Sequence, residues 1–438
     1  MNRHLLSGLA TVAVIAVVSA PGAAAQNVVP ELESDVDFVI KTITASHPAM
    51  HSELGLRSWG AMSEGMKHRQ VSTPLEAWRE LARLNPLFAD AHMFVGFADW
   101  RAETAAHLAA DGTLFPFEVA IDQAGTLTIT SALGGTATEL AGARILTING
   151  LSADRTTQLL LDRMHGDTPR FRANLLGQRW WLYHWKMFGA APRYRLTVAR
   201  GLQQWQLDVP GRGDLPATLR DESDVTRLFT LSTKPGCTAV MRVGSFDGAH
   251  RKYFTSFTQA AFAQLRKEAI STLVIDISAN GGGDDSLWLE GLMPYLATQP
   301  YRTGSSYVKR VVEANAERGE AVGQVVHGAI ETWHAPQSGH PLLFKGKVYV
   351  RIGPSTYSSA VLFANVMHDF GFGTLVGEGG TVRRAQSGGV RKWTLPHSQL
   401  AVWAPRFVLQ PPVPAASQLM LESERPWDPG LESQCGTD

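Results

Sequence analysis

Apolar side chains recur every three or four positions in the first part of the chain. Val36, Val39 and Ile43 follow this spacing, and Trp78 and Leu81 repeat it further on. Such a period predicts amphipathic helices with one buried face, and the prolines between these groups would separate one helix from the next. We therefore expect a helical module over residues 27–112, in which the apolar positions form core rather than a binding site.

Short alternating runs replace this pattern in the next part of the chain. Thr126–Ile129 and Arg195–Val198 predict strands. A further strand-like stretch, Gly142–Gly150, ends in an Asn-Gly pair, and a helical pattern follows it. A strand, an Asn-Gly turn and a helix are typical of PDZ-like modules, although Asn-Gly turns also occur in many other β proteins. The prediction for residues 113–212 is a PDZ-like β-rich module.

The last part of the chain, residues 213–438, has the pattern of an α/β domain. Three runs rich in branched apolar residues predict buried strands, and two helical patterns lie after the first and third of them. The strand-like runs are Ala239–Val243, Thr272–Ile277 and Lys347–Ile352, and the helical segments are Phe254–Arg266 and Ala360–Phe370. This order predicts a largely parallel sheet with covering helices.

The N-terminus has the three parts of a secretory signal peptide. Arg3 and His4 precede the apolar stretch Leu5–Ala20, and Ala23–Ala25 matches the small-residue cleavage pattern. The apolar stretch of about 16 residues is shorter than the roughly 20 that span a bilayer. We expect residues 1–25 to be removed and the mature protein to be periplasmic or secreted, without a stable membrane span. An uncleaved membrane anchor is the alternative.

Charge and cysteine content exclude several other functions. Lys plus Arg and Asp plus Glu both number 40, so the chain carries no net charge that would attract nucleic acid. Only Cys237 and Cys435 occur, with no Cys/His cluster, so neither a metal nor another cofactor is expected. In an oxidising compartment the two cysteines could form a disulfide; two separate buried thiols are the alternative.

Two motifs in the last domain could carry chemistry. The predicted strand ending at Ile277 runs into Gly281, Gly282 and Gly283, which would let a substrate approach main-chain N–H groups. A plain turn is the alternative. The second motif, Gly353–Ala360, places serines at the start of a helix, where free N–H groups favour developing negative charge. Helix capping is the ordinary role of a serine there.

Together these motifs resemble the tail-specific or C-terminal-processing serine peptidases. The matching segments are Asp276–Gly283, Thr356–Ala360 and Val376–Glu378. The resemblance implies a ClpP/crotonase-like catalytic core. It also implies that Ser358 is the nucleophile and that the backbone amides of Gly282 and Ser359 form the oxyanion hole.

The general base follows from comparing the branches of this family. The bacterial processing branch uses a lysine after the serine, but Arg383 stands there, and a guanidinium does not lose its proton. The tricorn-like branch uses a histidine from the N-terminal part, and the segment Asp90–Val95 resembles its motif. His92 is therefore the expected base, and His368 and His397 are poorer candidates.

An acid should orient this histidine. Glu424, Asp428 and Asp90 are the candidates, and Ala91 replaces the serine that tricorn-like enzymes carry beside their histidine. The resulting hypothesis is an exported, metal-independent serine peptidase that acts on a peptide or protein substrate. A catalytically silent peptide-binding relative and an esterase remain the alternatives.

Overall fold

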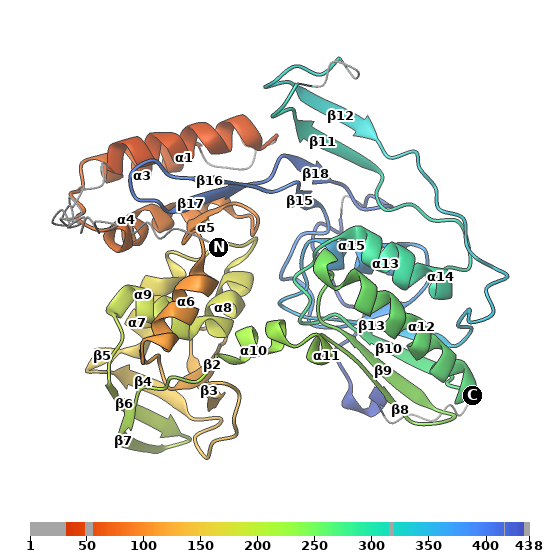
Figure 1. Ribbon diagram of the computed structural model, residues 1–438, viewed down its shortest axis with the longest axis horizontal. Helices are drawn as coiled ribbons and strands as arrows, with labels where there is room; N and C mark the ends of the chain where they lie inside the picture. Colours follow the sequence, from red (N-terminus) through yellow and green to blue (C-terminus); the bar gives the residue numbers. More distant parts are fainter. Residues whose placement is uncertain (1–31, 49–55, 315–318, 416, 433–438) are drawn as a thin grey trace, which may run out of the picture.

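The computed structural model describes residues 32–48, 56–314, 319–415 and 417–432 (Figure 1). The predicted signal peptide and Cys435 lie outside these residues. Cys237 is disulfide-bonded. In the described part of the chain, no helix combines the length and the apolar character needed to cross a bilayer.

The predicted α/β core is present. Its five-stranded sheet has the order β14-β13-β10-β9-β8, in which all neighbours are parallel except β8 and β9. The strands are β8 (Phe229–Thr233), β9 (Thr238–Val243), β10 (Thr272–Asp276), β13 (Lys347–Ile352) and β14 (Thr374–Gly377). Because β10 lies in the middle, its residues Leu273, Val274 and Ile275 are fully buried, as a continuous apolar run predicts.

Helices cover this sheet. They are α12 (Arg251–Lys267), α13 (Asp285–Gly291), α14 (Met293–Leu296) and α15 (Ser359–Asp369), and Figure 1 shows them along one side of the sheet. Two of them, α12 and α15, match the predicted helical segments. The shorter α10 (Ala217–Ser223), α11 (Val225–Leu228), η2 (Gly248–His250) and η4 (Pro429–Glu432) complete this part of the chain.

The β-rich part forms a second, antiparallel sheet of order β2-β3-β4-β6-β7, with β5 paired to β4. Its strands are β2 (Phe117–Ile121), β3 (Leu127–Ala132), β4 (Arg144–Ile148), β5 (Leu151–Ser152), β6 (Arg193–Arg200) and β7 (Gln203–Pro210), and its helices are α7 (Ala153–Leu161), α8 (Pro169–Gln178) and α9 (Trp180–Phe188). Helices α8 and α9 were not predicted. The aromatic residues of α9 have modest helix propensity, and burial of Trp180 and Trp181 stabilises it instead.

The N-terminal helices pack beside strands from the other end of the chain. These helices are α1 (Leu32–Ser46), α3 (Leu56–Lys67), α4 (Pro74–Leu81), η1 (Ala82–Leu84), α5 (Asn85–Phe88) and α6 (Trp100–Ala109). Strand β1 (Phe94–Gly96) pairs with β17 (Ala401–Ala404), which pairs with β16 (Arg391–Thr394). The buried Asp35 of α1 accepts hydrogen bonds from the backbone of His397 and Ser398, in the turn between β16 and β17. His397 therefore lies in a turn.

A fourth sheet, of order β12-β11-β18-β15, was not predicted. Its strands are β11 (Ser306–Arg310), β12 (Val325–Ala329), β15 (Gln386–Gly388) and β18 (Phe407–Leu409). They are short and mostly half-exposed, so they lack the apolar alternation that marks a strand in sequence. The projecting β11–β12 hairpin is clear in Figure 1. This sheet positions Gln386 and Ser387, which both reach the candidate active site.

Candidate active site

Ser358 occupies a strained position in the turn between β13 and α15. Its backbone angles are φ 55° and ψ −126°, a region that residues other than glycine rarely enter. Its side chain does not cap α15, so helix capping does not explain this serine. It is partly exposed, whereas its neighbours Tyr357 and Ser359 are buried. A strained strand-to-helix turn that exposes one serine is the geometry of a nucleophile elbow.

The side chain of Ser359 is held away from the solvent. Its hydroxyl donates to Asp285 Oδ1 and accepts a hydrogen bond from Trp288 Nε1 at 3.0 Å. Its backbone N–H, by contrast, is the first of α15 and has no partner within the helix. Ser359 therefore offers a main-chain donor next to Ser358, while its hydroxyl has a structural role.

Gly282 packs directly against Ser358. A Cβ added to Gly282 would lie 2.6 Å from Ser358 Cβ, and φ at this glycine is 99°. Its N–H donates to Asn280 Oδ1 at 2.8 Å, so the amide predicted as an oxyanion donor already has an acceptor in this structure. The glycine instead provides the space that the serine turn needs.

His92 is oriented through a serine that lies far away in sequence. Ser387 Oγ donates to Asp90 Oδ1 at 2.9 Å and lies 2.9 Å from His92 Nδ1. Because the Ser387 hydroxyl hydrogen points to Asp90, its oxygen accepts from His92, which places the ring proton on Nδ1. Nε2 is then unprotonated and has no partner within the described residues. This is the tautomer that a general base requires.

Two opposing effects set the charge of Asp90. Burial alone would raise the pKa of this carboxyl, but the nearby His47, whose Nε2 lies 3.7 Å from Oδ2, and His92 together lower it below its usual value. The His92 backbone N–H also donates to Asp90 Oδ1 at 2.7 Å. Burial lowers the pKa of His92 below 6.5, while the charge of Asp90 opposes that shift. At neutral pH Asp90 is therefore ionised and His92 is neutral.

Two contacts bring His92 and Ser358 into one site. The ring of Tyr357, the residue before Ser358, packs against the His92 ring with centroids 4.7 Å apart. Gln386, the residue before Ser387, accepts the Ser358 backbone N–H at 2.9 Å. His92, Tyr357 and Gly282 also line one cleft of about 1480 Å³. His92, the turn that carries Ser358 and the glycine turn therefore share an opening large enough for a peptide segment.

Comparison with known proteins agrees with this geometry. Residues 238–391 match the model of peptidase family S41. Peptidase family S41 is thus the family whose model this part of the α/β core matches. This is the family that the sequence motifs resemble, and the protein is a serine-type peptidase.

Solved structures show how far the fold of this S41 peptidase extends. A serine-to-alanine mutant of CPAF is similar over 91% of this chain and 92% of its own, with 13% identity and a TM-score of 0.63. Mature CPAF in complex with lactacystin matches 90% of this chain and 93% of its own, with 13% identity and a TM-score of 0.61. At this identity the likeness shows the fold alone. No curated protein matches the sequence.

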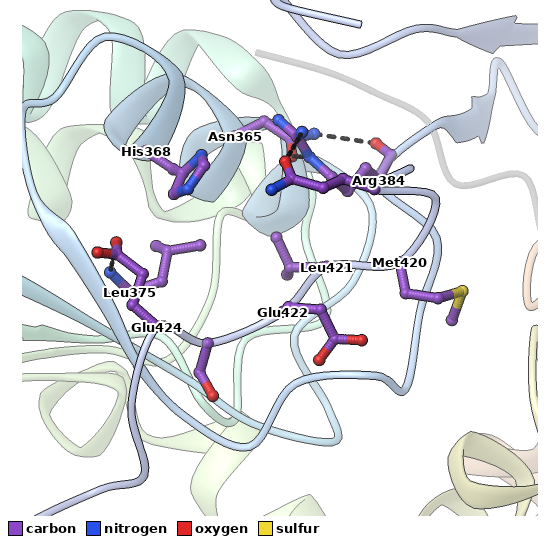
Figure 2. A pocket seen from close by; sticks show the side chains of 10 residues that line it. Asn365, His368, Leu375, Arg384, Met420, Leu421, Glu422 and Glu424 are labelled. Carbon is purple, nitrogen blue, oxygen red and sulfur yellow. Dashed lines mark hydrogen bonds between the residues drawn. The ribbon is translucent and has the colours of Figure 1, made fainter. Parts of the chain in front are cut away.

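Two of the three acids predicted for this S41 peptidase lie elsewhere. Glu424 is exposed, accepts the Leu375 N–H at 3.0 Å and borders a cavity of about 170 Å³ beside His368 (Figure 2). Asp428 is exposed and accepts the N–H of Gly430 at 2.8 Å. Neither forms a hydrogen bond or ion pair with His92 in the described part of the chain, whereas Asp90 reaches it through Ser387.

Sequence reasoning missed Ser387 and Gln386 entirely. The resemblance directed attention to the residue beside the histidine, Ala91, whose missing hydroxyl is supplied here by Ser387. The one local signal is that Gln386 and Ser387 are polar and precede two glycines. Such sequences are common in loops and do not by themselves indicate a functional site. In the S41 peptidase, as far as the structure describes it, no three His, Cys, Asp or Glu side chains group as metal ligands.

Proposed function

We propose that this protein is an exported S41 peptidase that hydrolyses peptide bonds with Ser358 as nucleophile and His92 as general base. The observation that carries the proposal is the chain of hydrogen bonds from His92 Nδ1 through Ser387 to Asp90. It holds the imidazole in the tautomer whose Nε2 can accept a proton. The strained, partly exposed Ser358 supplies the hydroxyl group that donates this proton.

In the first step, the Ser358 hydroxyl proton moves to His92 Nε2 and Oγ bonds to the scissile carbonyl carbon. The carbonyl oxygen takes the electron pair and becomes an oxyanion. The imidazolium then returns the proton to the leaving amine as the C–N bond breaks. A water molecule repeats the sequence on the acyl-enzyme and releases the new carboxylate. Through Ser387, the ionised Asp90 stabilises the imidazolium that forms in each half.

The oxyanion is proposed to bind the backbone N–H of Ser359 at the start of α15. That amide precedes the helical hydrogen-bond ladder, and the helix dipole favours negative charge there. Gly281 and Gly283 border the same cleft and carry the nearest exposed main chain that could provide a second donor. The N–H of Gly282 is excluded because it donates to Asn280.

The substrate and compartment are proposed on more general grounds. The cleft of about 1480 Å³ suits an extended peptide, and residues 113–212 are proposed as a PDZ-like module that binds the chain by strand addition. Export rests on the signal-peptide pattern of residues 1–25. Protein from an expressing bacterium should be found in the periplasm or medium and begin near Gln26. Retention in the cytoplasm would contradict export, and an exported protein that keeps residues 1–25 would favour the uncleaved anchor.

A fluorophosphonate probe tests the nucleophile and base directly. The wild-type protein should be labelled, whereas Ser358→Ala and His92→Ala should not react at a measurable rate. Ser355→Ala is the matched control, because Ser355 lies in the same turn and its hydroxyl only accepts from Asn174 and Gln178. Labelling of Ser358→Ala would overturn the assignment, and absence of labelling in the wild type would favour a silent relative. Faster turnover of esters with no cleavage of peptides would favour an esterase.

A further inference from the structure

The segment Arg383–Ser387, here called the strap, contacts both halves of the site. Ser387 contacts His92. Gln386, the residue before Ser387, donates from Nε2 to the Arg383 carbonyl at 2.6 Å. The same Gln386 side chain accepts the Ser358 backbone N–H. The Gln386 side chain therefore connects the Arg383 carbonyl with the backbone amide of Ser358.

The side chain of Arg383 reaches the opposite half. Its Nη1 donates to the carbonyl of Ala89 at 2.7 Å, and Ala89 begins the base loop, Ala89–His92. Ala89 itself has a left-handed backbone with φ 48°, a conformation that must be stabilised by its surroundings. Because a guanidinium stays protonated at any working pH, Arg383 can hold this loop but cannot act as a base.

Asp167, in the loop between α7 and α8, ties the same three segments together. Its Oδ1 accepts from the hydroxyl of Tyr357 at 3.0 Å and from the Ala91 N–H at 3.3 Å, and its Oδ2 accepts from the Arg383 N–H at 3.0 Å. Its side chain is only 3% exposed. One buried carboxylate therefore joins the nucleophile turn, the base loop and the strap.

We propose that Asp167 and Arg383 are positioning residues that set the spacing between His92 and Ser358. Neither touches the reacting atoms. Each instead fixes the base loop against elements that hold the nucleophile: Arg383 through Gln386, and Asp167 through Tyr357. The inference rests on the proposed function, since it concerns the geometry of that serine and histidine. Misplacement of a reacting group by about 1 Å can cost about 100-fold in rate, so loss of these contacts should slow the chemistry.

The test measures fluorophosphonate labelling rates and peptide turnover in the full-length mature protein. Asp167→Asn keeps the shape but can accept on only one side, and Arg383→Met keeps the aliphatic stem but loses the donors. Each should lower kcat and the labelling rate by about 10-fold or more, with KM little changed, because the peptide cleft is intact. Arg383→Lys retains a donor that can reach Ala89 and should recover part of the loss.

The pH profile separates positioning from simple support of the fold. Burial, followed by the charge of Asp90, raises the pKa of Asp167 to about 6, while Arg383 and Tyr357 partly oppose this. Protonation of Asp167 removes one of its hydrogen-bond acceptors. As the pH is lowered through about 6, the wild-type labelling rate should therefore fall more than protonation of His92 alone would cause, and Asp167→Asn should lack this additional fall. His92 and Asp90 in the base loop and His165 in the loop of Asp167 are the other ionisable groups nearby, and all three remain in the variant.

A control variant removes a different contact, between α8 and the residues that follow β14. Arg170 in α8 donates to the carbonyl of Gly379 and pairs with Glu378, but it contacts neither the base loop nor Tyr357. Arg170→Met should keep wild-type labelling below its melting temperature. If Asp167→Asn and Arg383→Met also label at the wild-type rate, or slow no more than Arg170→Met, positioning is wrong while the proposed function stands. If Ser358→Ala still labels, the proposed function fails first.

Discussion

Ser387 Oγ lies 2.9 Å from His92 Nδ1, although 295 residues separate the two along the chain. The contact exists because β15, which carries Ser387, forms the edge of a four-stranded sheet, while His92 directly precedes β1. The His92 ring and the Asp90 carboxylate do not hydrogen-bond directly, because His92 Nδ1 is 4.0 Å from Asp90 Oδ1. The Ser387 hydroxyl lies between them and connects the two side chains. The orientation of His92, the proposed base, therefore depends on Ser387, which comes from a different sheet.

Removing this hydroxyl should impair catalysis more than stability. In Ser387→Ala, His92 Nδ1 loses its acceptor and the ring can rotate or change tautomer, so kcat should fall on the order of 100-fold. Ser387→Thr keeps the hydroxyl and should retain more activity than Ser387→Ala. Steady-state cleavage of a peptide substrate measures both variants. Equal activity of Ser387→Ala and wild type would mean that the relay has no role.

The acid can be identified by comparing two amide substitutions. Asp90→Asn removes the charge that stabilises the His92 imidazolium, so kcat should fall on the order of 100-fold or more. Glu424→Gln is the matched control, because that exposed carboxylate only accepts the Leu375 N–H, and its kcat should stay near wild type. The reverse order of effects would move the orienting acid to the C-terminal segment.

The acid limb of the rate profile should reflect a histidine that is hard to protonate. Burial lowers the pKa of His92 below 6.5, so the reactive neutral form persists into mildly acidic solution and the rate rises with pH to a midpoint below 6.5. Asp90 opposes that shift. Asp90→Asn should therefore move the midpoint of the His92 ionisation to still lower pH. We would measure the labelling rate as a function of pH with and without Asp90→Asn. Both proteins would carry Asp167→Asn, so that His92 is the group that titrates. A midpoint that Asp90→Asn moves to higher pH would contradict the prediction.

Gly282 should tolerate no side chain. In Gly282→Ala the new methyl group would meet Ser358, and φ of 99° would be strained in alanine. A cost of about 1–3 kcal/mol in unfolding free energy and a marked loss of labelling are expected. Gly281→Ala is the control, because nothing lies within 4 Å of its added Cβ. Denaturant unfolding and probe labelling of the two variants should therefore differ clearly, and equal behaviour would contradict the close packing.

The sequence was most informative where signals are local. The apolar run of β10 is buried on both faces of the parallel sheet, and β9 and β13 each bury one face, so their composition alone predicted them. Ser358 was predicted from the family resemblance, which combines its motif with the glycine turn and with Val376–Glu378, and its backbone strain then distinguished it from a capping serine. The strands depend on a few neighbouring residues, whereas the serine needed several separate segments read together.

The partners of His92 could not be predicted in the same way. Whether Asp90, Glu424 or Asp428 reaches His92 depends on how separate sheets pack, which the residues beside each acid along the chain do not indicate. Gly282 shows a similar limit, since the side chain of Asn280 engages its amide, and no spacing rule indicates that. Helix α9 was missed because tertiary burial of its tryptophans outweighs their modest helix propensity.

The pairing of β1 with β17 also determines when the site can assemble during synthesis. A chain emerging from the ribosome can fold its N-terminal helices early, and His92 is made long before Ser358. The strap and β17 are made later. His92 has no hydrogen-bond partner in Ser387 until the strap has emerged, and β1 has no pairing strand until β17, which ends at Ala404, has emerged. A newly made chain therefore has an incomplete candidate site through most of its translation.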